Sequence, residues 1–172
     1  MSREFEGGRF QAPYQAPEKE MLTATLDFNR ATIKWKVEGL SLEDAKRPMT
    51  PTDTKLLGIV KHLAYVEVWW FQDNFLGREC TYPWSESGDM EADFEIEPDE
   101  TIESIFALYD AQCEVSRQIV EEASLDDVAV RPRRDGGHPS LRWIMLHMIE
   151  EVARHNGHAD ILRELIDGKT GA

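Results

Sequence analysis

Three residues with metal-binding side chains occur at positions from which they could share one ion: His62, Glu151 and His155. Glu151 and His155 are four residues apart, and side chains one helical turn apart converge on one point. On a helical wheel His155 lies within the apolar stripe of its segment, and Glu151 lies at the edge of that stripe. Two imidazoles and one carboxylate suit zinc or a related divalent ion. They leave a coordination position open, as catalytic sites do.

The same residues allow other interpretations. Glu-x-x-x-His pairs on helix surfaces are often plain i,i+4 partners, and a lone buried histidine is usually a satisfied core residue. His147 and His158 lie further round the last helical segment, toward solvent, and would replace a proposed ligand if the register differed. Glu67, in the apolar stripe near His62, is either a partner that orients a ligand histidine or a buried acid paired with an arginine such as Arg30.

Four long helices must position these residues. Apolar residues recur at helical spacing over four segments, which are approximately residues 18–39, 52–76, 98–123 and 140–167. Ser140 is a credible N-cap of the last segment, and Gly77 ends the second. The residues 41–44 resemble a capping box, but the prolines that follow allow only a short turn.

Two stretches lack the helical period. Residues 1–17 contain paired glycines and two prolines, which predict an irregular arm. Residues 78–98 predict a long connection with a short extended piece at 94–96, and connections of this length are often functional or cross the end of a bundle. We therefore expect one domain over residues 18–172, of all-α class, folded as a four-helix bundle with a long crossover between its second and third helices.

Composition excludes several classes of function. The chain carries 33 acidic against 19 basic residues, a net charge of −14, which would repel a phosphate backbone, so we expect no nucleic-acid partner. The arginines at 131, 133 and 134 form either a solvated loop or a site for one small anion. No apolar run approaches the ~20 residues that span a bilayer, so we expect no membrane segment. The N-terminal residues contain no signal segment, and Cys80 and Cys113 are predicted to be free thiols. We therefore expect a cytoplasmic protein.

Two stretches carry a resemblance to a known family. The segments KHLAYVEVWWF and SLRWIMLHMIEEVARHNGHADILRELIDG resemble the DinB-like superfamily, most closely the branch related to mycothiol-dependent maleylpyruvate isomerase and mycothiol transferases. The resemblance implies a bundle of up-down-down-up topology that holds a divalent metal, most often zinc or nickel. His62 would be one ligand. Many members have His-x-x-x-His on the last helix. Here His155 matches the second of these histidines, and Glu151 replaces the first, as in the isomerase branch.

The activity that this resemblance implies is thiol activation, in which a metal with an open position stabilises the thiolate of mycothiol or a similar small thiol for attack on a small electrophile. We therefore expect a metal-dependent transferase or isomerase. Arg154 and the arginines at 131, 133 and 134 would contact carboxylates of the thiol cofactor or the substrate. The chain would form a homodimer in which Trp69 lies at the interface or lines a pocket. The alternatives are a non-catalytic bundle that binds metal or a small ligand, for example in a stress response, and a metal-dependent hydrolase that activates water.

Overall fold

The computed structural model describes residues 3–171, and most of this part of the chain is helical. The elements follow in the order β1 (Glu4–Phe5), η1 (Glu6–Gly8), β2 (Arg9–Phe10), α1 (Glu18–Trp35), α2 (Leu42–Ala45), α3 (Leu56–Glu67), η2 (Val68–Phe75), α4 (Trp84–Ser87), η3 (Ala92–Phe94), α5 (Ile102–Glu122) and α6 (Leu141–Asp167). Within residues 3–171 the only sheet is the pair β1–β2, so the all-α class is confirmed. None of the helices in this range combines the length and the apolarity that crossing a bilayer requires.

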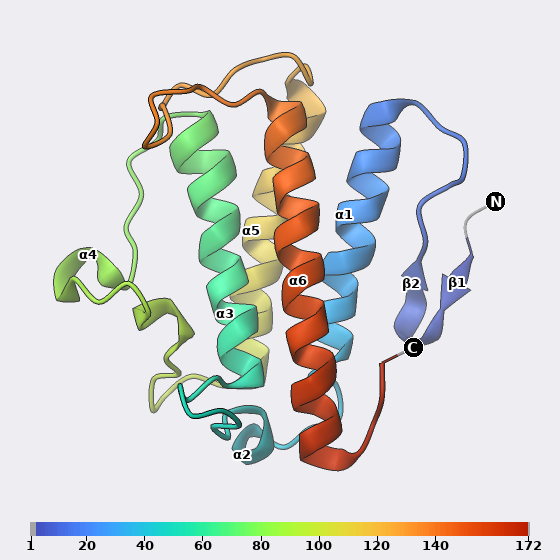
Figure 1. Ribbon diagram of the computed structural model, residues 1–172, viewed down its shortest axis with the longest axis vertical. Helices are drawn as coiled ribbons and strands as arrows, with labels where there is room; N and C mark the ends of the chain where they lie inside the picture. The colour runs from blue at the N-terminus through green and yellow to red at the C-terminus, as the bar shows by residue number, and fades with distance from the viewer. Residues whose placement is uncertain (1–2, 172) are drawn as a thin grey trace.

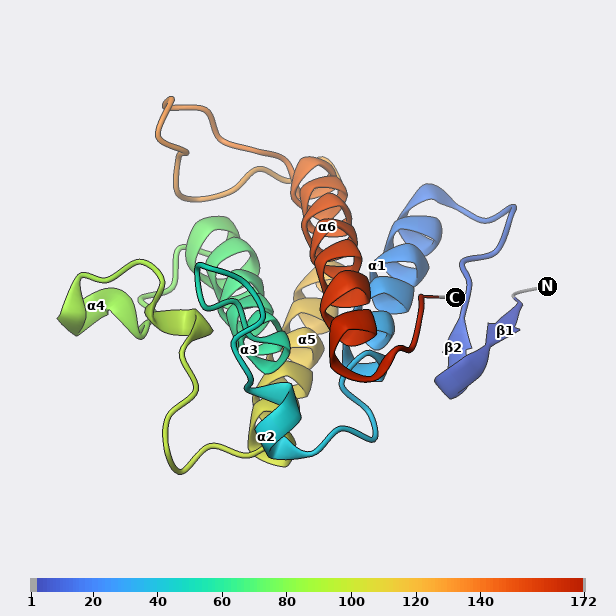
Figure 2. The same cartoon turned by 60° about the horizontal axis from the view of Figure 1, so that its bottom comes forward.

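The four long helices lie side by side (Figure 1). α1 packs against α6, and α3 packs against both α5 and α6. Figure 1 shows the chain descending in α1 and α6 and ascending in α3 and α5, so a long segment must return along the outside between the end of α3 and the start of α5. Figure 2 brings the lower end forward and shows this crossover, with α4, standing to one side of α3.

α3 passes without a break into η2, which is a π-helical segment. At its end the amide of Leu76 donates to the carbonyl of Phe71, five residues earlier, at 3.3 Å. One extra residue per turn shifts the side chains that follow round the helix axis, and π-helical turns are frequent at functional sites. η2 therefore sets which aromatic side chains face α6 and which face the solvent.

The core is a continuous apolar cluster from the facing stripes of the four long helices. Fully buried aliphatic and aromatic side chains of this kind each contribute about 1.5–3 kcal/mol relative to exposure. The almost completely buried members of this apolar cluster include Leu26, Ile33, Leu56, Leu57, Leu63, Phe71, Ile105, Tyr109, Leu141, Ile144, Met148 and Val152.

Glu67 lies in this core and pairs with Arg30. The Nε and Nη2 atoms of Arg30 donate to the two carboxylate oxygens of Glu67 at 2.8 and 2.6 Å, and Nη1 donates to Asp27 at 2.9 Å. Both side chains are buried. Of the two interpretations of Glu67, the buried ion pair is therefore correct, and Glu67 orients no histidine. Removal of one partner from such a pair costs about 3–5 kcal/mol, because the other charge stays buried.

Two helices begin later than the apolar pattern predicts. α3 begins at Leu56 rather than at residue 52 or 53, and α5 begins at Ile102 rather than at residue 98 or 99. In α5 the reason is a reciprocal cap, because the hydroxyl of Thr101 accepts from the amide of Ser104 and that of Ser104 accepts from the amide of Thr101. The predicted cap at Ser140 is confirmed, since its hydroxyl accepts from the amide of Trp143.

The N-terminal arm differs from the irregular segment that we expected. β1 and β2 form an antiparallel hairpin around Gly7 and Gly8, both of which have positive φ angles that favour glycine. Arg9 is buried, its guanidinium lies 3.9 Å from the centre of the Trp35 ring, and it donates to Thr32 at 3.2 Å. The arm is therefore packed on α1. The glycine pair between two short runs is the signal that indicates such a hairpin.

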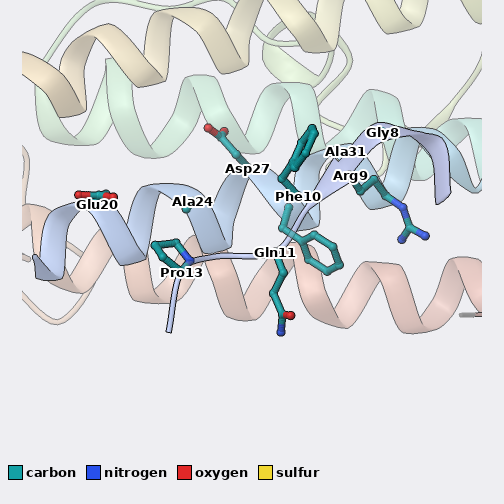
Figure 3. A pocket seen from close by; sticks show the side chains of 10 residues that line it. Gly8, Arg9, Phe10, Gln11, Pro13, Glu20, Ala24, Asp27 and Ala31 are labelled. Carbon is teal, nitrogen blue, oxygen red and sulfur yellow. The ribbon is translucent and has the colours of Figure 1, made fainter. Parts of the chain in front are cut away.

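A pocket of about 440 Å³ separates the arm from α1 (Figure 3). Figure 3 shows Phe10, Gln11 and Pro13 of the arm opposite Ala24 and Asp27 of the helix. The pocket shares no lining residue with the three predicted metal ligands.

Candidate metal centre

The structure brings the three predicted ligands together between α3 and α6. One ligand atom from each of His62, Glu151 and His155 lies within 4.8 Å of the other two. The Nε2 atom of His155 is 3.2 Å from Oε1 of Glu151, and Nε2 of His62 is 4.0 Å from the same oxygen. The three side chains are 12–18% exposed, so the group is mostly buried but still reaches solvent.

Neither alternative histidine joins this group. The ring of His147 lies against two indoles, 4.7 Å from the centre of Trp70 and 5.1 Å from that of Trp143. His158 is exposed, with its ring centre 5.3 Å from that of His155. Both histidines are therefore neighbours of the centre rather than members of it.

Arg154 projects from the exposed side of α6. Its side chain is 55% exposed, and it donates to Glu150 at 3.2 Å. Its second terminal nitrogen lies 3.8 Å from Glu151. The contact with Glu151 places it at the rim of the centre, and its predicted contact with a thiol cofactor or substrate stays a prediction.

Asp93 is the residue of the centre that the sequence did not reveal. It lies in η3, within the crossover, and is buried. Its Oδ2 atom is 2.7 Å from Nδ1 of His62, and because a carboxylate can only accept, the imidazole donates from Nδ1. The lone pair of Nε2 is then free toward Glu151 and His155. A carboxylate that fixes the tautomer of a histidine in this way is the usual companion of a metal ligand.

The crossover reaches His62 because α3 has a glycine one turn earlier. A methyl group built on Gly58 would lie 2.3 Å from the carbonyl oxygen of Phe94, so only glycine allows the two backbones to approach this closely. The ring of Phe94 then stacks on that of His62, with centres 4.0 Å apart and planes 14° apart. Lys61 holds the next residues, donating to the carbonyl of Glu95 at 2.6 Å and to Glu100 at 2.8 Å.

The place of Phe94 differs from the sequence prediction of an extended piece at 94–96. Residues 92–94 form a single tight turn, and the backbone becomes extended only at Glu95. The turn is favoured because it directs Asp93 inward to the imidazole while Phe94 covers the ring face.

The charges of the centre favour a cation. The hydrogen bond with the imidazole of His155 and the nearby imidazole of His62 hold the pKa of Glu151 well below its usual range. Burial opposes protonation of His62, but its hydrogen bond with Asp93 and the nearby carboxylate of Glu151 outweigh this and raise its pKa. Nδ1 of His155 and Oδ1 of Asp93 are buried with no hydrogen-bond partner among the described residues. Two imidazoles, an ionised carboxylate and unsatisfied polar atoms are a donor set that fits a divalent cation.

A comparison with protein families decides where the chain belongs. The model of the mycothiol-S-transferase family matches residues 21–168. The chain belongs to the mycothiol-S-transferase family. The match includes all four long helices, apart from the first turn of α1, and the three residues of the centre. The resemblance to the mycothiol transferase branch is therefore confirmed. No curated protein matches the chain.

Proposed function

We propose that the protein is a divalent-metal-dependent S-transferase that activates mycothiol or a similar small thiol for attack on a small electrophile. The observation that carries the proposal is the meeting of His62, Glu151 and His155 in a chain of the mycothiol-S-transferase family. The match also supports a DinB-like four-helix bundle of up-down-down-up topology, with residues 18–172 as one domain. The homodimer and the cytoplasmic location stay predictions.

The chain supplies the metal ligands, a residue that orients one of them, and side chains that partly cover the site. His62, Glu151 and His155 would hold the ion, zinc or nickel by their chemistry, and Asp93 would keep His62 in the tautomer that binds it. When bound, such an ion lowers the pKa of a thiol that occupies its open position, so that the thiolate forms at neutral pH. Phe94 covers one face of the centre. The low pKa of Glu151 keeps its carboxylate ionised and suited to a ligand rather than to a proton donor.

The chain offers no thiol of its own at the centre. Burial raises the pKa of the Cys113 thiol, and Cys80 also has a raised pKa because it is partly buried. Neither belongs to the metal cluster found among residues 3–171. The nucleophile is therefore expected to come from a cosubstrate. Its sulfur forms the new bond to the electrophilic carbon, while the leaving group departs with the electrons of the bond that breaks.

Metal content tests the proposal first. Protein prepared without a polyhistidine tag and reconstituted with zinc or nickel should hold about one equivalent of metal, and Glu151→Ala should lose most of it. Glu150→Ala is the matched control, because Glu150 is the exposed neighbour, with a side chain 65% exposed. Metal content below about a tenth of an equivalent in the wild type would overturn the proposal. Equal retention by the two variants would overturn the role of Glu151.

Thiol transfer is the second test. The metal-loaded protein should join mycothiol to 1-chloro-2,4-dinitrobenzene, and chelation of the metal should remove this rate. Calorimetric titration with mycothiol separates the other functions. A protein that binds metal but no thiol, and that cleaves esters, would be a hydrolase instead. One that binds metal and does neither would be a binding module.

A further inference from the structure

Another cavity lies between η2 and the loop that precedes α6, and we call it the arginine cavity. It has a volume of about 720 Å³ and is lined by Trp69, Trp70 and Asn74 of η2 and by the loop 132–135. Figure 1 shows this loop, which precedes α6, reaching over the upper ends of α3 and α6. The arginine cavity shares no residue with the metal centre.

The loop that forms one wall is held in place by the end of η2. The amides of Val130 and Arg131 donate to the carbonyls of Phe75 and Asn74, each at 3.0 Å. The side-chain amide of Asn74 donates back to the carbonyl of Arg131 at 3.2 Å, and the guanidinium of Arg131 lies 3.0 Å from Asp73. Four contacts between two segments far apart in the sequence give the cavity a defined wall, although the loop itself is exposed.

Arg133 supplies the charge of the arginine cavity. Its guanidinium lies 4.4 Å from the centre of the Trp143 ring and 5.7 Å from that of Trp70, so two indoles hold it in position. Among the side chains that the structure describes, no carboxylate forms an ion pair with Arg133 or Arg134. The carboxylate of Asp135 accepts from the amide of Gly137 instead. In a chain of net charge −14, two arginines at one cavity without carboxylate partners leave a local positive field for an anion.

The arginine cavity and the metal centre lie along the same run of helix, because α3 passes without a break into η2. Trp69 follows His62 by seven residues, which is roughly 10 Å along the helix. Between the two sites lies His147, one turn from Glu151 and in contact with the ring of Trp70 at 4.7 Å. A flat molecule about 10 Å long could therefore place one end in the arginine cavity and the other beside the metal centre.

We propose that the arginine cavity binds the carboxylate end of an aromatic organic acid. The guanidinium of Arg133 presents paired N–H donors that match a carboxylate, and the faces of Trp69 and Trp70 suit a flat apolar body. The inference rests on the proposed function in one respect: given thiol transfer, the acid is the electrophile, and its reactive carbon faces the thiol at the metal centre.

Binding tests the arginine cavity without reliance on catalysis. Calorimetric titration of the metal-loaded protein should show that 2-naphthoate binds and that the uncharged 2-naphthamide binds about tenfold more weakly or less. Arg133→Met should lower the affinity for 2-naphthoate about tenfold and leave the affinity for 2-naphthamide unchanged. The affinity of Arg133→Lys for 2-naphthoate should lie between those of the wild type and Arg133→Met. Arg47→Met is the matched control, because it removes the same charge from an exposed arginine beside α2, away from the cavity. Thermal unfolding of each variant checks that the fold is retained.

Other outcomes overturn the proposal. Absence of naphthoate binding by the wild type would do so, as would equal affinity for the amide or equal losses in Arg133→Met and Arg47→Met.

Catalysis separates this inference from the proposed function. With mycothiol, Arg133→Met should lower kcat/KM for 4-chloro-3-nitrobenzoate about tenfold and leave that for the uncharged 1-chloro-2,4-dinitrobenzene unchanged. Specific naphthoate binding without any thiol transfer would retain the arginine cavity and reject the proposed function. Transfer to both electrophiles with no effect of Arg133→Met would reject the arginine cavity and retain the proposed function.

Discussion

We expect metal binding to depend on Asp93, a residue that would itself touch no metal. Its carboxylate fixes His62 in the tautomer whose Nε2 is free, and it adds negative charge beside the centre. Asp93→Asn keeps the shape but removes the charge, so we expect the metal affinity to fall about 10- to 100-fold. Competition with a chromophoric chelator measures this change.

Asp99→Asn is the control for that variant. Asp99 is exposed and lies near the start of α5, so its replacement changes the net charge equally without contact with His62. If the metal affinity falls by the same factor in Asp93→Asn and Asp99→Asn, the effect comes from the overall charge, and Asp93 has no positioning role.

The two cysteines should differ in reactivity, and both should be poor nucleophiles. Burial raises the pKa of each thiol above that of a free cysteine, so at a given pH a smaller fraction is thiolate. We expect a disulfide reagent to label Cys80 in the native protein at a rate that still rises above pH 9, and to label the buried Cys113 only after unfolding. Absorbance of the released thiol counts the sites, and Cys80→Ser should abolish the native signal. A rate that levels off below pH 8 would contradict the raised pKa.

The sequence indicated the three candidate ligands but not Asp93, and the reason is periodicity. Glu151 and His155 are one turn apart on a strongly periodic helix, so a wheel places them on the same face. His62 was placed with them mainly by resemblance. Asp93 lies 31 residues from His62 in a segment without a period, among many other acids. Only the path of the chain in three dimensions distinguishes it from them.

At the scale of elements, the close contact at Gly58 fixes the crossover on α3. Gly58→Ala should favour the helix itself by about 1 kcal/mol. The added methyl group would nevertheless meet the Phe94 carbonyl at 2.3 Å, so η3 must move and carry Asp93 away from His62. We expect weaker metal binding and faster proteolysis within residues 78–98, measured by chelator competition and by limited digestion.

Gly157→Ala is the matched control, since Gly157 is also in a helix and a methyl group there meets no atom within 4 Å. It should stabilise the protein by about 0.5–1 kcal/mol and leave metal binding unchanged. If Gly58→Ala behaves in the same way, the close approach of the crossover does not position the centre.

Helix interiors were predictable from the sequence, while helix starts and connections were not. The apolar repeat of α6 is local and sums over many residues, so its bounds agree closely with the pattern. The start of α5 depends on two hydroxyls at Thr101 and Ser104, which outweigh the acidic residues before them. The glycine pair of the N-terminal hairpin is a local signal, but the packing of Arg9 on Trp35 that holds the hairpin against α1 is a contact that no local pattern contains.

For the whole molecule, the dominant electrostatic fact is its negative charge. Many of its ion pairs are exposed and contribute little, whereas the repulsion among unpaired acids acts over the whole surface. At the arginine cavity, two arginines offset this field locally. This distribution predicts that salt should stabilise the protein by screening, in contrast to proteins held together by surface ion pairs.

We expect the unfolding temperature to rise when the sodium chloride concentration is raised from about 20 mM to about 300 mM, because the screening length then falls to less than a third. A double variant, Glu121→Lys with Glu164→Lys, provides the control. Both glutamates are exposed, and each replacement adds two positive charges, so the net charge changes from −14 to −10. The variant should unfold at a higher temperature than the wild type in low salt and should gain less from added salt. An unfolding temperature that falls with salt, or equal salt dependence in the two proteins, would show that local ion pairs rather than overall repulsion govern the stability.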